Sequence, residues 1–385
     1  MKALEAGNRD REDGCNAIPL FRNYPLLAER LPRAPLGLFP TPVERLDQLG
    51  DEIGLDRLYI KRDDLSGSVY GGNKIRKLEF LLGDALRAGA KEVMTLGFAG
   101  SNHALATAIC ARQLGLRSAS MLMPQANAHY VRRNLLASHH HRAELHYCEN
   151  RLRLTLGIIR ESLRGRLRDG AFPRFIPGGG SCPLGVTGYV NAAFELRDQI
   201  EAGHMPAPDV IYVPMGSMGT AAGLTLGLGA AGLRSRVVAV RVIEERWAHR
   251  RQMARLVRGT GSFLRGLDPG FPTPGLAEDA LTIRDDCMGD GYARFTEKGV
   301  KAAELMSRRA GIILNGAYSA KAFSAVIEDA RSQRLNRKTV LFWNTYNSRD
   351  LSAIASRVDC RQLPGAFHRY FEEDVQPLDR PGLDR

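Results

Sequence analysis

The stretch "GGNKIRKLEFLL", residues 71–82, decides the fold, because a lysine follows two glycines and an asparagine and then leads into an apolar-periodic segment. Counted along a helix, Lys74 shares the stripe that faces a core with Leu78, Leu81, Leu82, Ala85 and Leu86. Arg76, Lys77 and Glu79 fall mostly on other faces, and we expect them to be solvated. An inward ammonium needs a partner or a chemical role. On this stretch alone, a salt-bridged or snorkelling lysine explains the pattern as well as a reactive one.

The length of 385 residues favours two domains over one. We predict a large domain of residues 1–76 and 190–385 and a smaller inserted α/β domain of residues 77–189. Hydrophobic content of 44% and charged content of 25% are typical of a soluble globular protein. No apolar run approaches the ~18 residues of a membrane span, and the opening "MKALEAGNRDREDGCNA" has no apolar centre. We therefore expect a cytoplasmic protein with a frayed start and no membrane partner.

Charge and cysteine patterns exclude several other classes. The net charge of +12 is spread along the chain, so we expect no nucleic-acid partner. The six cysteines form no CxxC pair and are expected to be reduced. The stretch "SHHHRAELHYC", residues 138–148, has no nearby carboxylate-rich set, so we expect no metal site. The arginine-rich segment 151–168 predicts an amphipathic helix whose inward residues are Leu152, Leu154, Leu156, Ile159 and Leu163.

Strand-like and helix-like segments alternate from residue 57 onward, which is typical of parallel sheets covered by helices. The expected strands include "EVMTLGF", "RSASMLMP", "AELHYC", "RFIPGGG", "DVIYVPMG", "VVAVRVI", "IILN" and "TVLFWNT". The Pro-rich tail, residues 362–385, is expected to be a surface extension. The sequence thus predicts an α/β protein with twisted, mostly parallel sheets flanked by helices.

Three turns that open helices carry the residues best suited to chemistry, since ligands gather at the carboxyl ends of parallel strands. The first holds Lys74. The second, "GFAGSNHALATA", places Ser101, Asn102 and His103 at a helix start, where a carboxylate is favoured, although a plain N-cap explains it equally well. The third, "PMGSMGTAAG", offers amides and hydroxyls to a phosphate from Gly216, Ser217, Met218, Gly219 and Thr220. Together they describe a site for pyridoxal 5'-phosphate and an amino-acid substrate.

At these motifs the sequence resembles the D-cysteine desulfhydrases and 1-aminocyclopropane-1-carboxylate deaminases. These belong to the tryptophan-synthase-β-like, fold type II class of pyridoxal phosphate enzymes. The resemblance runs from "FPTPVERL" to "TVLFWNT", and "KRDDLSGSVYGGNKIRKLEFLL" is its most specific motif. It implies a two-domain fold and a homodimer.

Site residues follow from the resemblance position by position. Lys74 would be the Schiff-base lysine, and Asn73 would contact the phenolic oxygen of the cofactor. Ser101, Asn102 and His103 would bind the substrate carboxylate, with "SNH" closer to the desulfhydrase branch. Residues 216–220 match the phosphate loop. Tyr292 and Tyr318 fall where the family keeps two active-site tyrosines.

Departures from the family pattern cluster on the far side of the cofactor. "NGAY" replaces "DPVY", and Ser319 stands where the family has threonine or glutamate against the pyridine nitrogen. A hydroxyl there favours elimination over chemistry that needs a strong electron sink. In "WNTYNS", Tyr346 and Asn347 add bulk where the family has glycines, and Gly100 replaces a glutamine and is expected to widen the pocket.

The leading interpretation is a lyase that removes a leaving group from Cβ of a small amino acid and releases a 2-oxo acid and ammonia. Lys74 would take the α-proton, and Tyr318 and Tyr292 would assist the leaving group or bind substrate. β-Replacement or cyclopropane opening on the same scaffold is the second interpretation. A cofactor-binding protein without turnover is the third, because a fold does not fix a function.

Overall fold

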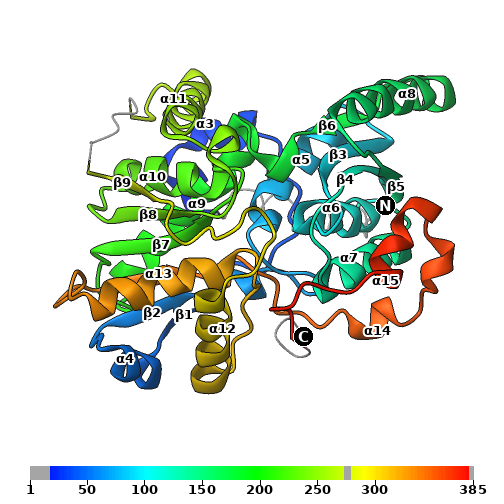
Figure 1. The fold of residues 1–385 in the computed structure, drawn as a ribbon. Helices are drawn as coiled ribbons and strands as arrows, with labels where there is room; N and C mark the ends of the chain where they lie inside the picture. Colours follow the sequence, from blue (N-terminus) through cyan, green and yellow to red (C-terminus); the bar gives the residue numbers. More distant parts are fainter. Residues whose placement is uncertain (1–17, 273–278, 381–385) are drawn as a thin grey trace.

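The computed structural model describes residues 18–272 and 279–380 and shows two sheets, each covered by helices (Figure 1). The strands are β1 Val43–Arg45, β2 Leu58–Lys61, β3 Glu92–Phe98, β4 Arg117–Met123, β5 Glu144–Tyr147, β6 Arg174–Ile176, β7 Val210–Met215, β8 Arg236–Arg241, β9 Leu281–Arg284 and β10 Val340–Trp343. The helices are α2 Pro19–Asn23, α3 Pro25–Arg30, α4 Asp47–Ile53, α5 Lys74–Arg87, α6 Asn102–Gln113, α7 His129–His140, α8 Arg151–Asp169, α9 Pro183–Glu201, α10 Gly219–Ala230, α11 Arg250–Leu267, α12 Glu297–Ala310, α13 Ser319–Arg331, α14 Ser352–Ala355 and α15 Arg369–Glu372. The predicted frayed start and Cys15 lie outside the described residues.

The larger sheet has six strands in the order β1-β2-β10-β7-β8-β9. Every pair is parallel except β1 with β2, which confirms the predicted α/β class. The expected strand "IILN" is wrong: residues 312–315 form no strand, and Ile312 and Leu314 pack into the core. The sheet position beside β8 is taken by β9, which the sequence analysis missed.

The smaller sheet has four parallel strands in the order β5-β4-β3-β6. Helix α6 packs on the face that carries Val93 and Leu122, while α8 covers the face that carries Met94 and Met121. The predicted domain limits at residues 76/77 and 189/190 fall inside α5 and α9. The exact division therefore stays a prediction, although the two sheets lie in separate lobes (Figure 1).

Helix α8 presents its apolar stripe to solvent, so the predicted inward face is wrong. Leu152, Leu156, Ile159 and Leu163 are exposed, with Leu152 at 68%. Only Glu161 and Gly165 are fully buried, and Leu154 and Ile158 pack partly against the sheet. The sheet face beneath is small: among the described residues its buried apolar cluster consists of Met94, Ala119, Met121 and Cys148, with Leu96 and Met123 partly buried beside it.

The carboxyl-terminal tail is packed against the smaller lobe, so the predicted surface extension is also wrong (Figure 1). Leu363, Phe367 and Tyr370 are buried in one cluster with Tyr130 and Leu145. Three apolar side chains in a charged, Pro-rich segment supply the contact area that holds it there. Residues 381–385 lie outside the described range.

The first turns of α5 are held by buried charge, which corrects the expectation that Arg76, Lys77 and Glu79 are solvated; each is at most 2% exposed. Arg76 bonds Asp63 and Glu195, each at 2.8 Å, and Lys61 also bonds Glu195, at 2.7 Å. Glu79 pairs with Arg33. The cluster of Lys61, Asp63, Arg76 and Glu195 contains two cations and two anions. Their mutual attraction offsets the free-energy cost of removing these charges from water. Leu86, placed on the inward stripe, is 41% exposed near the end of the helix.

Candidate active site

One cavity of about 240 Å³ collects residues from all three predicted turns. The turns follow η1 (Asp63–Leu65), β3 and β7, and the segment after β10 closes another side. The predicted site residues that line it are Asn73, Lys74, Ser101, Asn102, His103, Gly216, Ser217, Met218, Gly219, Thr220, Tyr292 and Tyr318. These residues lie close together because the carboxyl ends of parallel strands meet at one edge of a sheet.

Lys74 is the first residue of α5 and faces the cavity. Within residues 18–272 and 279–380, its ammonium has no hydrogen-bond or ion-pair partner, in contrast to Lys61, Lys77 and Lys321. Burial lowers the pKa of Lys74 to about 8. A substantial share of this amine is therefore neutral near pH 8, as a nucleophile or a base requires.

The loop before α10 forms a cradle that suits a phosphate. Met218 has a positive φ of 66°, which turns the chain into the helix start. The Gly219 N–H donates to Ser181 Oγ at 3.2 Å, and Ser181 Oγ donates to Ser217 Oγ at 2.8 Å. A Cβ at Gly219 would lie 2.5 Å from Ser181 Oγ, so no side chain fits there. The amides and hydroxyls of this loop therefore fit the phosphate group of pyridoxal phosphate.

Asn73 ties the lysine turn to this loop, because its Nδ2 donates to Thr220 Oγ1 at 2.9 Å. Lys77 lies beside the same loop, where a Cβ on Gly219 would come within 2.7 Å of its Nζ, and it donates to the Gly179 carbonyl at 3.0 Å. Burial, reinforced by the Lys74 charge, lowers the pKa of Lys77 well below its usual value. A bound phosphate would supply the negative charge that this ammonium lacks.

The start of α6 forms the wall suited to a carboxylate. Ser101 caps the helix by accepting a hydrogen bond from the Ala104 N–H at 3.2 Å, and Asn102 Oδ1 accepts one from Asn134. His103 is 3% exposed, and within the described residues neither ring nitrogen makes a hydrogen bond of standard geometry, although the ring also interacts with the Pro177 backbone. Burial and the Lys74 and Lys77 charges lower the pKa of His103 well below its usual value. The imidazole is therefore neutral and can donate one hydrogen bond to a ligand.

Tyr292 and Tyr318 form a hydroxyl pair in the cavity, joined by a short hydrogen bond. Burial raises the pKa of Tyr292 to about 12, and burial also raises that of Tyr318 well above its usual value. Both phenols stay protonated at neutral pH and remain proton donors. The Phe98 ring lies 4.5 Å from the Tyr292 ring and holds it from one side.

Three residues singled out in the sequence lie away from the cavity wall. Ser319 Oγ accepts a hydrogen bond from the Asn315 N–H at 2.8 Å, and its side chain is fully buried. Its role against the pyridine nitrogen stays a prediction. Asn347 Oδ1 accepts from the Gly71 N–H and lies off the cavity wall, whereas Thr345 and Tyr346 of the altered loop line it. Gly100 faces Tyr130 and Val131, where a Cβ would approach to 2.8 Å, so the expected widening of the pocket is wrong.

Sequence reasoning missed part of the cavity wall. Tyr70, Gly178, Gly179 and Trp247 line it, and Ser181 supports the phosphate cradle. The run "PGGGSC" after β6 held a usable signal, because glycines followed by a hydroxyl after a strand resemble the other two glycine-rich turns. Trp247 lies in a short turn after β8 and carries no such signal.

Comparison with known proteins identifies the family. The family model described as "Pyridoxal-phosphate dependent enzyme" matches residues 35–345. This chain belongs to that family. It is 32% identical to the D-cysteine desulfhydrase of Serratia proteamaculans over 86% of this chain and 98% of that protein. The crystal structure of a 1-aminocyclopropane-1-carboxylate (ACC) deaminase homologue superimposes with a TM-score of 0.72 at 32% identity, and the match covers 87% of this chain and 97% of that one.

A fungal L-serine ammonia-lyase from Rhizomucor miehei shares the fold alone, with a TM-score of 0.56 at 17% identity over 83% of this chain and 98% of that one. The predicted fold type II architecture and the pyridoxal phosphate cofactor are therefore confirmed. No helix in the described part of the chain is long and apolar enough to span a membrane.

Proposed function

We propose that this pyridoxal phosphate enzyme is a lyase that performs α,β-elimination on a small β-substituted amino acid of the D-cysteine type and releases a 2-oxo acid and ammonia. The observation that carries the proposal is the position of Lys74. Its unpaired amine faces the cavity that also holds the phosphate cradle and a pair of protonated tyrosines. The "SNH" spelling and the likeness to a D-cysteine desulfhydrase support this substrate class. A cytoplasmic homodimer belongs to the same proposal.

The bound cofactor supplies the electron sink that makes the α-proton of an amino acid acidic. The helix start at residues 101–103 orients the substrate carboxylate through backbone N–H groups and the His103 ring. Lys74 takes the α-proton, for which its lowered pKa of about 8 is well matched to neutral pH. Tyr318 or Tyr292 gives a proton to the leaving group, a role that the raised pKa of each phenol permits.

A screen of D- and L-amino acids with β-leaving groups, read as 2-oxo acid and ammonia released, tests this proposal. We expect D-cysteine or a related compound to turn over and 1-aminocyclopropane-1-carboxylate to be poor or inert. Faster deamination of the ring compound would replace elimination with ring opening. Product formation only with an added nucleophile would indicate β-replacement. Bound cofactor without any turnover would indicate a binding protein.

Borohydride reduction and peptide mapping test the role of Lys74 separately. We expect the cofactor label on Lys74, because Lys61 is held by Glu195 and Lys321 by the Met288 carbonyl. Label on Lys61, Lys77 or Lys321 would refute the assignment. The Lys74→Ala variant should lose turnover while it keeps its fold.

A further inference from the structure

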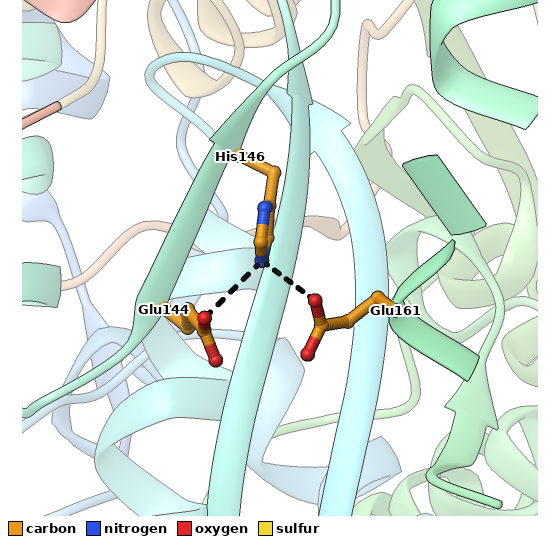
Figure 2. Close-up of side chains that lie close together, drawn as sticks. All are labelled: Glu144, His146 and Glu161. Carbon is orange, nitrogen blue, oxygen red and sulfur yellow. Dashed lines mark ion pairs between the residues drawn. The ribbon is translucent and has the colours of Figure 1, made fainter. Parts of the chain in front are cut away.

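A second cluster of ionisable side chains lies on the outer face of the smaller sheet, away from the cofactor cavity. Glu144 and His146 are two residues apart on the edge strand β5, so their side chains share one face. Helix α8 covers that face and directs Glu161 toward them. Figure 2 shows the His146 ring between the two carboxylates. The sequence analysis found no carboxylate-rich set near the stretch that contains His146, and that premise is wrong, because Glu161 joins Glu144 beside its ring.

The distances between these three side chains are long for hydrogen bonds from the histidine to the glutamates, but they suit a metal ion placed between them. His146 Nε2 lies 3.5 Å from Glu161 Oε2 and 4.0 Å from Glu144 Oε1. All three ligand atoms lie within 4.8 Å of one another. A tetrahedral ion with bonds near 2.1 Å holds its ligand atoms about 3.4 Å apart. Small side-chain rotations would therefore bring the three atoms onto one ion.

Buried polar atoms without hydrogen-bond partners also indicate that a metal ion binds here. The Glu161 side chain is fully buried, and its Oε1 has no hydrogen-bond partner in the part of the chain that the structure describes. His146 Nε2 has none there either. A buried carboxylate oxygen without a partner is costly, so such groups normally bind a cation or a donor.

The nearby arginines only partly meet this need. Arg164 is 53% exposed; it bonds Glu144 closely but reaches Glu161 Oε2 at only 3.5 Å. Arg168 is occupied by Glu92 and Asp169. Neither arginine bonds Glu161 Oε1, which has no partner among the described side chains.

Another group of this kind, Asp286, Cys287 and Glu328, lacks these features. Arg284 bonds both carboxylates there, and Lys298 also bonds Glu328. Burial raises the pKa of the Cys287 thiol to about 11, so the thiolate that binds metals is scarce at neutral pH. This second group provides a matched control.

We propose that Glu144, His146 and Glu161 bind a divalent transition-metal ion, Zn²⁺ by preference, with water in the fourth position. One imidazole and two carboxylates match the ligand preferences of Zn²⁺. The exposed Arg164 side chain swings into solvent when the ion enters. The ion would clamp α8 to β5, which fits a helix whose only fully buried residues are Glu161 and Gly165.

The test is Zn²⁺ competition against a chromogenic chelator, using cofactor-loaded enzyme freed of metal and of excess cofactor. We expect one tight Zn²⁺ per chain, weakened at least about tenfold in His146→Gln, Glu161→Gln and Glu144→Gln. Arg164→Gln should bind Zn²⁺ more tightly, because it removes the competing cation. His140→Gln and Glu328→Gln should bind as the wild type does. Absence of tight binding, or equal binding by wild type and His146→Gln, would overturn the proposal.

Hydrogen exchange locates the ion and guards against a misfolded variant. Glu144 is partly exposed, so its neutral glutamine variant should fold normally. Zn²⁺ should slow amide exchange in residues 151–169 of the wild type but not in Glu144→Gln. Slowing confined to another part of the chain would place the ion elsewhere and refute the site.

Discussion

Replacing Lys74 by methionine should stabilise the cofactor-free protein at neutral pH. The side chain carries an unpaired ammonium in a mostly buried position, and burial lowers its pKa from 10.5 to about 8. Since each pKa unit is worth about 1.4 kcal/mol, folding with this lysine protonated costs up to about 3 kcal/mol. Methionine has a similar length and no charge, so it removes that cost. The figure is an upper limit, because the side chain borders an open cavity whose water screens the charge.

The pH dependence has a definite sign. Below pH 8 the folded lysine is protonated and the full cost is present. Between pH 8 and 10.5 the folded protein loses this proton while the unfolded chain keeps it, so wild-type stability gains up to about 3 kcal/mol. The advantage of Lys74→Met should therefore be largest at pH 7 and vanish near pH 10.5.

Urea unfolding of the cofactor-free proteins at pH 7 and pH 9.5 measures this difference. Lys301→Met, a change on an exposed face of α12, is the matched control and should leave the midpoint unchanged at both values. Added pyridoxal phosphate should reverse the order, because only the wild type can bind it through this amine. A Lys74→Met variant no more stable than the wild type at pH 7 would show that the ammonium has a partner or full hydration, and the argument for its reactivity would fail.

Three further outcomes are expected. The double variant Ser217→Ala with Thr220→Ala should need more added cofactor for full occupancy, as measured by absorbance titration. Thr225→Ala is the control, because the Thr225 hydroxyl bonds the backbone of its own helix. An unchanged cofactor affinity in the double variant would show that the loop is only a helix cap. His103→Gln should raise KM for the substrate more than it lowers kcat, and the reverse would argue against a binding role. Glu195→Gln should cost about 3–5 kcal/mol in unfolding free energy, because Lys61 and Arg76 then share one buried anion; a loss below about 1 kcal/mol would contradict this.

The sequence predicted the fold class and most of the cavity because both depend on local patterns. Apolar runs that alternate with helical periods place strand ends together, and glycines followed by hydroxyls mark the helix starts that bind anions. The three turns carrying Lys74, Ser101 and Gly216 could therefore be placed in one site before any contact was known.

The sequence analysis erred where the burial of a side chain depends on residues that are far away in sequence. Arg76 is buried because it pairs with Asp63 and Glu195, which are distant from it in sequence. The apolar periodicity of the helix around residue 76 cannot predict these partners. The leucines of α8 show the converse, since their spacing favours burial but the sheet face beneath the helix is too small. Glu161 escaped notice for the same reason, because its neighbour His146 is close in space and fifteen positions away in sequence.

The buried cluster of Lys61, Asp63, Arg76 and Glu195 restricts how this sequence can change over generations. Loss of any one of the four leaves an uncompensated charge in the interior, so a single substitution there is expected to destabilise the fold strongly. Only paired changes that remove one cation and one anion together, such as Lys61→Met with Glu195→Gln, keep the interior neutral. The four positions are therefore expected to be inherited as a set.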